Sequence, residues 1–183
     1  MIQMIPRIII PIWLGLITEV TGIALGFVLL TQATPANPLL INLVLLAVAF
    51  LMFWYFPHSL SHYIVGRLLG IRFNHYYLHV SGMSRIDNSF LAWTGKLMPM
   101  LGVKADRISL RSATPDRRAA MFAAGVTVSM IAPVICIYTA FAIGAPHIGL
   151  LLTAVLVGNG LFTVYFSGKV GDISKAAKAR FSK

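Results

Sequence analysis

Two histidines four residues apart, His58 and His62, form the pattern in this sequence with the clearest chemical use. In a helix this spacing puts both rings on one face, about one turn apart. Two imidazoles placed in this way can share one metal ion. Ser59 follows the first histidine, so no carboxylate lies between them. The pattern predicts a pair of metal ligands; the alternative is two interfacial histidines bonded to backbone carbonyls or water.

The helix that holds this pair has to form in a very apolar chain. Of its 183 residues, 58% are hydrophobic and 11% are charged, and a soluble domain of this length would need more polar surface. Several apolar stretches are long enough to cross a hydrocarbon core of about 30 Å, which takes roughly 20 residues. We therefore predict an all-α integral membrane protein with four transmembrane helices and a small β or interfacial insertion.

The whole chain, residues 1–183, is expected to form one membrane domain. Its spans are predicted at about residues 8–31, 39–66, 117–143 and 147–168. An insertion at about 71–114 separates the second span from the third. Within it we expect a strand at 71–80, an interfacial helix or hairpin at 88–101, and a second short strand at 103–112. A basic tail, residues 169–183, follows the last span.

The basic residues set the expected orientation of these spans. All 15 lysines and arginines lie in three segments, 1–7, 67–118 and 169–183, and the turns at 32–38 and 144–147 have none. Cytoplasmic segments of membrane proteins carry the excess of lysine and arginine, which places both termini and the insertion in the cytoplasm. The net charge of +10 then indicates attraction to an anionic lipid bilayer and not to nucleic acid.

Only five acidic residues are available to complete a metal site or to act as a base. Asp172 follows the fourth span and so reaches the same membrane face as His58 and His62. It would equally suit the first turn of a helical tail. Glu19 lies in the middle of the first span, where a carboxylate costs about 2.5–3.5 kcal/mol and usually faces the interior of the bundle.

The sequence His-Ser-Leu-Ser-His at 58–62, together with Asp172 at the end of a later helix, resembles the site-2 protease family of intramembrane zinc metalloproteases, in its compact zincin form. The similarity covers about residues 45–178 and includes the stretches 61–71, 117–125 and 167–173. It implies a three-helix core made of the second, third and fourth spans, with one additional N-terminal helix. It also implies that His58, His62 and Asp172 bind zinc.

Three departures from the family pattern matter, one of them the replacement of the family's Ala-Gly-Pro proline by Val126. Ser59 stands where the family has its catalytic glutamate, and a serine hydroxyl neither ionises near neutral pH nor reaches as far. A well-placed general base contributes about 10²–10⁴-fold to the rate. The family often has an Asn-Pro element shortly before the aspartate, whereas Asn159 lies thirteen residues before Asp172. We therefore expect a catalytically impaired pseudoprotease that keeps zinc and binds a membrane segment of a partner protein.

Two other functions are compatible with the same residues. The first is an active zinc metalloprotease in which Glu19, at a depth similar to that of His58, supplies the missing base from the first span. The second is a structural accessory subunit of a larger membrane complex with no chemistry of its own; in a variant of it, His58 or His62 binds a haem or chlorophyll-type pigment. For the pseudoprotease, the strand after residue 70 could pair with an extended segment of the partner.

Overall fold

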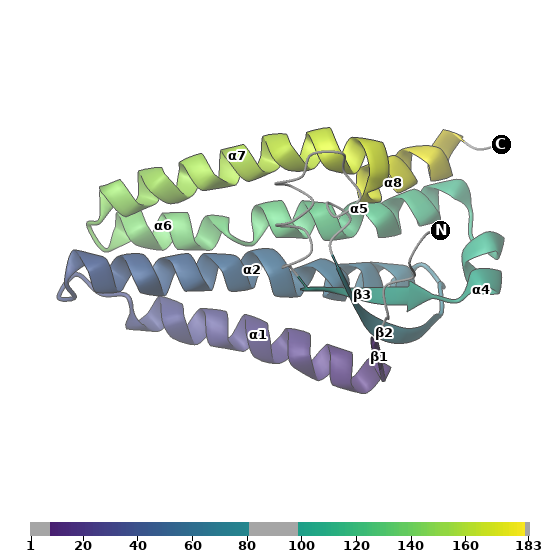
Figure 1. Cartoon of the computed structure of the whole chain (residues 1–183), viewed down its shortest axis with the longest axis horizontal. Coiled ribbons are helices and arrows are strands. Elements are labelled where there is room, and N and C mark those ends of the chain that lie inside the picture. Colours follow the sequence, from purple (N-terminus) through teal and green to yellow (C-terminus); the bar gives the residue numbers. More distant parts are fainter. Residues whose placement is uncertain (1–7, 81–98, 182–183) are drawn as a thin grey trace.

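The computed structural model describes residues 8–80 and 99–181, which form a bundle of helices with a small sheet at one end (Figure 1). The elements are, in order, β1 (Ile8–Ile10), α1 (Ile12–Gln32), α2 (Leu39–Leu68), β2 (Phe73–Val80), β3 (Pro99–Ala105), α4 (Arg107–Ser112), α5 (Pro115–Ile131), α6 (Val134–Ala142), α7 (Pro146–Val170) and α8 (Asp172–Phe181). A mainly helical fold with a small β insertion is thereby confirmed.

Four helical segments in the described part of the chain are long and apolar enough to cross a membrane. They are α1, α2, the pair α5–α6 at Pro115–Ala142, and α7 as far as Tyr165. Their outer surfaces carry large apolar side chains; Leu40 and Leu161, for example, are each 70% exposed. Such surfaces are unfavourable in water and suit a hydrocarbon environment. The fold therefore supports an integral membrane protein.

The first and third spans differ in detail from the sequence prediction. Residues 8–10, which the predicted first span includes, form β1, and α1 begins at Ile12. The third span is interrupted between α5 and α6 at Pro133, whose ring nitrogen has no hydrogen to donate to the preceding turn. Pro57, by contrast, lies inside α2. Helix α2 is therefore continuous through the residues that carry the histidine pair.

Helix α2 lies at the centre of the bundle, with α1 packed on one side and α5 on the other (Figure 1). On the α1 side the approach is close because α1 has glycine at 15, 22 and 26, where a Cβ would crowd aromatic rings of β2 and α2. Small residues allow this kind of contact between membrane helices. Away from the sheet, a buried apolar cluster joins α2 to α6 and α7; it includes Leu46, Phe50, Cys136 and Ile148.

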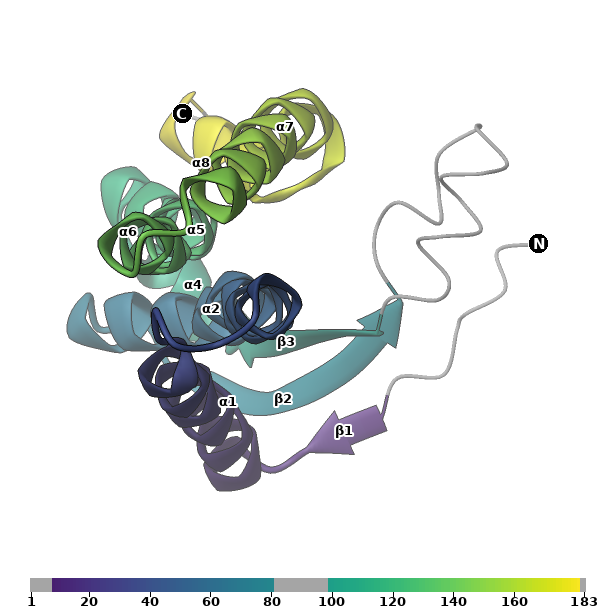
Figure 2. The ribbon, with the colours of Figure 1, turned by 90° about the vertical axis from the view of Figure 1, so that its left-hand side faces the viewer.

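The sheet has β2 in the middle, with antiparallel β1 and β3 on either side (Figure 2). The strand predicted at 71–80 is confirmed, since β2 covers Phe73–Val80. At residues 76–78 it pairs with both neighbours. Over these residues β2 therefore has no unpaired side left for an extended partner segment, contrary to the expectation from the sequence.

The second predicted strand, at 103–112, is wrong beyond Ala105. There β3 ends, and Asp106 caps α4 by accepting a 2.9 Å hydrogen bond from the Ser109 amide. A carboxylate in this position favours the start of a helix. The interfacial helix or hairpin predicted at 88–101 lies outside the described residues except for residues 99–101, which belong to β3.

Candidate metal centre

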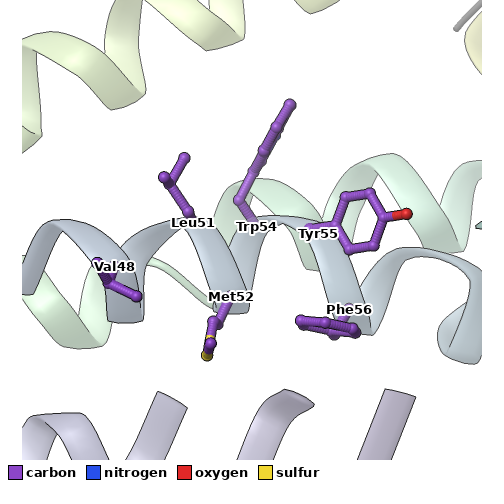
Figure 3. Close-up of a pocket in the computed structure, with 6 residues that line it drawn as sticks. All are labelled: Val48, Leu51, Met52, Trp54, Tyr55 and Phe56. Atoms are coloured by element: carbon purple, nitrogen blue, oxygen red, sulfur yellow. The ribbon is translucent and has the colours of Figure 1, made fainter. Parts of the chain in front are cut away.

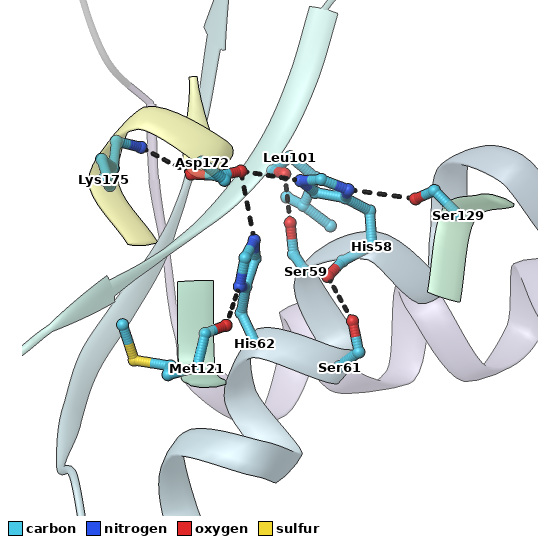
Figure 4. Close-up of polar contacts among 9 residues, drawn as sticks. All are labelled: His58, Ser59, Ser61, His62, Leu101, Met121, Ser129, Asp172 and Lys175. Atoms are coloured by element: carbon cyan, nitrogen blue, oxygen red, sulfur yellow. Dashed lines mark hydrogen bonds and ion pairs between the residues drawn. The ribbon is translucent and has the colours of Figure 1, made fainter. Parts of the chain in front are cut away.

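The two histidines lie on one face of α2, as their spacing predicts. Their ring centroids are 4.9 Å apart and the rings are nearly perpendicular, at 87°. The His58 and His62 side chains are 22% and 12% exposed, so both lie mostly within the protein. Figure 4 shows them reaching from consecutive turns of α2 toward α8. The helix thus presents two imidazoles to the same point.

The third side chain at this point is Asp172, the first residue of α8. Its Oδ2 lies 3.3 Å from Nε2 of His58 and 3.3 Å from Nε2 of His62 (Figure 4). One ligand atom from each residue lies within 4.8 Å of the other two. The structure therefore brings together all three residues that the sequence predicts as metal ligands. Asp172 is also a first-turn acid of α8, so the alternative role suggested for it is compatible with the first.

The separations fit a metal ion better than direct hydrogen bonds. In tetrahedral zinc with bonds of about 2.0–2.1 Å, neighbouring ligand atoms lie about 3.3 Å apart. A charge-assisted N–H···O bond is shorter, about 2.7–2.9 Å. The observed 3.3 Å from Asp172 to each histidine matches the first value. The three residues are therefore close enough to hold one metal ion.

The Nδ1 atoms of both histidines contact residues of α5. Nδ1 of His62 lies 2.6 Å from the Met121 carbonyl oxygen, and Nδ1 of His58 lies 3.0 Å from the Ser129 hydroxyl. A carbonyl oxygen can only accept, so Nδ1 of His62 carries a hydrogen. In the neutral ring this leaves the lone pair on Nε2, the atom that faces Asp172. The ring of His62 is therefore oriented as a metal ligand.

Asp172 is held in its charged form. Burial alone would raise its pKa, because burial disfavours a carboxylate. The close approach of His58 and His62, together with attraction to Lys175, outweighs burial and holds the pKa of Asp172 well below its usual range. The Lys175 ammonium donates a 2.7 Å hydrogen bond to Oδ1. This leaves Oδ2 as the oxygen that faces the histidines.

No family model, curated protein or solved structure matches the chain. The resemblance to site-2 proteases stays a prediction from the sequence around His58, His62 and Asp172. What the site can do follows from the surrounding side chains.

The side chain of Ser59, the residue after His58, is engaged by β3. It is 2% exposed, and its hydroxyl donates to the Leu101 carbonyl of β3 (Figure 4). The Leu101 amide in turn donates a 3.1 Å hydrogen bond to the Tyr55 hydroxyl. Ser59 and Tyr55 therefore attach β3 to α2, and the Ser59 hydroxyl is engaged by a backbone carbonyl.

Glu19, the candidate replacement base, is 1% exposed and accepts a 2.8 Å hydrogen bond from the Tyr76 hydroxyl of β2. The backbone amide of Leu60 is a second partner. Burial and the neighbouring carboxylate raise the pKa of the Tyr76 phenol above its usual range, so the phenol keeps its hydrogen. Helix α1 and helix α5, which backs the histidines, lie on opposite sides of α2 (Figure 1). The position of Glu19 therefore gives no support to a displaced base.

Asn159 is not part of the cluster either. It lies in α7, where its Nδ2 is 4.0 Å from Sδ of Met130 on α5. This is a contact between two helices, of the kind that polar side chains make in membranes. The structure therefore gives Asn159 a packing role.

An apolar pocket of about 290 Å³ lies along α2, within the three turns that precede His58 (Figure 3). Figure 3 shows Leu51 and Trp54 on one side of the helix and Met52 and Phe56 on the other. The side chains that line this pocket are mainly aliphatic and aromatic. The metal-ligand cluster thus lies beside an apolar surface of the same helix.

Four residues that hold the site in place do not appear among the sequence-based candidates: Tyr55, Met121, Ser129 and Lys175. Met121 acts through its backbone carbonyl, which has no sequence signal. Ser129 does have a sequence signal, because it follows Met121 and Gly125 at intervals of four. These three are the buried residues of α5. That spacing matches the four-residue spacing of the histidines.

Proposed function

We propose that this protein is a membrane-embedded, zinc-binding pseudoprotease of the site-2 protease type. The observation that supports this most is the convergence of His58 Nε2, His62 Nε2 and Asp172 Oδ2, each from a side chain whose other polar atom has its own partner. Two histidines and one carboxylate form a zinc set that leaves the fourth position open. When bound there, zinc would polarise a water or carbonyl ligand.

The surroundings of the site support binding over hydrolysis. General base catalysis needs a proton acceptor within hydrogen-bond reach of the attacking water. The Ser59 hydroxyl is bonded to Leu101, and the Glu19 carboxylate is bonded to Tyr76. Asp106 caps α4. Within residues 8–80 and 99–181, the family's base therefore has no counterpart at the cluster, and we expect little or no peptide hydrolysis.

The orientation that we propose puts the metal centre near the cytoplasmic face. The sheet, α4 and α8 lie at one end of the bundle, and the α1–α2 and α6–α7 turns lie at the other (Figure 1). Residues 32–38 and 144–147, which form those turns, contain no lysine or arginine. The excess of positive charge marks the cytoplasmic side.

The partner that we propose is a transmembrane segment of another protein, bound along the apolar pocket of α2. The lining of this pocket and its position beside His58 support this choice. A photo-crosslinker at Leu51, in native membranes, is expected to give a discrete protein adduct. The same probe at Leu161, which is 70% exposed on α7, serves as the lipid-facing control. Identical results at the two positions would remove the partner from the proposal.

Metal content tests the central claim. The detergent-purified full chain is expected to contain about one zinc per molecule by elemental analysis. The His58→Ala/His62→Ala variant is expected to contain none. His75→Ala/His147→Ala is the matched control, because it also removes two histidines but none from the cluster, and it should keep its zinc. A wild-type protein that takes up no zinc, even when zinc is supplied, would refute the proposal.

A further inference from the structure

One face of α5 packs against both histidines of α2. The buried residues of α5 are Met121, Gly125 and Ser129, and a spacing of four places them along one side of a helix. The first two meet His62, and the third meets His58. The contacts thus run in opposite order along the two helices: the earlier residues of α5 contact the later histidine of α2, and Ser129 contacts the earlier one.

Helix α5 supports His62 in two ways: through a backbone carbonyl, and through the absence of a side chain at one position. The Met121 carbonyl accepts from Nδ1. At Gly125, a Cβ would overlap the His62 ring, so the missing side chain is what makes room for the imidazole. Neither contribution depends on a polar side chain.

The support that α5 gives to His58 is different, because it comes from a side chain. Ser129 is 3% exposed, and its Oγ lies 3.0 Å from Nδ1 of His58. A buried hydroxyl in an apolar helix needs a partner, and this one has the imidazole. With Nδ1–H donating to Oγ, the lone pair of the ring lies on Nε2, 3.3 Å from Asp172.

We propose that Ser129 is a positioning residue for the metal ligand His58. With a metal on Nε2, Nδ1 of His58 carries the hydrogen, and the Ser129 hydroxyl accepts it and fixes the rotation of the ring. This inference rests on the proposed zinc site. Partners of this kind behind a metal-bound histidine change metal affinity by about 10–100-fold when they are removed.

The test compares variants of the full chain in detergent, with zinc affinity measured by competition against a chromophoric chelator. Ser129→Ala is expected to bind zinc about 10–100-fold more weakly than wild type. Ser129→Thr keeps the hydroxyl and should restore most of the affinity. Thr127→Ala removes a hydroxyl from the exposed side of the same helix and should match wild type.

Cobalt substitution gives a readout that a purely structural role would not change. The visible absorption bands of bound Co²⁺ report the ligand geometry, and they should shift in Ser129→Ala but not in Thr127→Ala. If Ser129→Ala does not fold, Ser129→Val replaces it, because Val and Thr have the same shape and differ in the hydroxyl. Wild-type affinity and spectrum in a folded Ala or Val variant would overturn the inference.

The outcomes separate this inference from the proposed function. Zinc uptake by the wild type, lost in His58→Ala/His62→Ala, tests the zinc site before any Ser129 variant is measured. A wild-type protein without metal binding would overturn both. A metal-binding wild type with unaffected Ser129 variants would overturn only the role of Ser129.

Discussion

The Ser59 hydroxyl of α2 donates a hydrogen bond to the backbone carbonyl of Leu101 in β3. The amide of the same leucine donates to Tyr55, one turn earlier on α2. Both backbone polar groups of Leu101 are therefore bonded to side chains of the helix that carries the histidines. Ser59, the residue after His58, thus has a structural contact of its own.

Removing that contact should weaken the fold without removing the metal. Ser59→Ala leaves the Leu101 carbonyl without its partner, and an unsatisfied buried group costs about 1–3 kcal/mol. We expect the free energy of unfolding to fall by this amount and the zinc content to stay at the wild-type level. Denaturant titration and elemental analysis of the same samples measure the two quantities. Loss of zinc with unchanged stability would show that Ser59 faces the site.

Asp172 should be required for zinc binding. An asparagine has no negative charge, so Asp172→Asn removes the only carboxylate of the His58–His62–Asp172 group. We expect its zinc content to fall to that of the double histidine variant. Asp116→Asn is the control, because Asp116 is an exposed first-turn acid of α5. Equal zinc content in the two variants would exclude Asp172 as a ligand.

Gly125 should tolerate no side chain. In Gly125→Ala the new Cβ would occupy the space of the His62 ring, and the ring would have to leave its position. We expect strongly reduced zinc binding, although alanine favours a helix over glycine by about 1 kcal/mol. At Gly158 in α7 a Cβ meets nothing within 4 Å, so Gly158→Ala should bind zinc normally. Normal zinc binding by both variants would contradict the placement of His62.

Glu19 should matter for stability and not for the metal. Glu19→Leu leaves the Tyr76 hydroxyl without an acceptor, which costs about 1–3 kcal/mol of unfolding free energy. Glu19→Gln keeps an acceptor oxygen and should cost less. Both variants should retain zinc and have the same residual hydrolysis of a model peptide as wild type. A loss of hydrolysis in Glu19→Gln alone would revive the active protease with a displaced base.

Zinc itself should stabilise the folded protein. A ligand that binds only the folded state adds about 2.7 kcal/mol to the unfolding free energy when present at 100 times its Kd. We therefore expect zinc to raise the Tm and a chelator to lower it. The His58→Ala/His62→Ala variant should respond to neither. A similar response in that variant would mean that zinc binds elsewhere.

The sequence predicts the coarse fold well because its strongest signal is hydropathy. Long apolar runs predict the four membrane-length helices, and the pattern of basic loops brings His58, His62 and Asp172 to one end of the bundle. Three residues far apart in the chain could be grouped in this way because the number of spans between them fixes which face each one reaches. The distances between their atoms could not be predicted.

Other features depend on contacts that leave no local pattern. Residues 8–10 are isoleucines continuous with an apolar run, so only their pairing with residues 76–78 makes them a strand. The partner of Ser59 is a backbone carbonyl 42 residues away, and any residue type could supply it. Pro133 does indicate the break between α5 and α6, since proline disrupts a helix interior. Hydropathy alone, however, predicts one continuous span across this position.

The contact between His62 and Asp172 joins points 110 residues apart in the chain. Bringing such distant segments together costs the unfolded chain conformational entropy, which grows with the logarithm of the loop length. Unlike a disulfide, a metal that binds only the folded state leaves the denatured ensemble unconstrained, so its binding free energy has to offset this entropy. A metal shared by α2 and α8 would therefore act as a reversible cross-link that closes more than half of the chain into one loop.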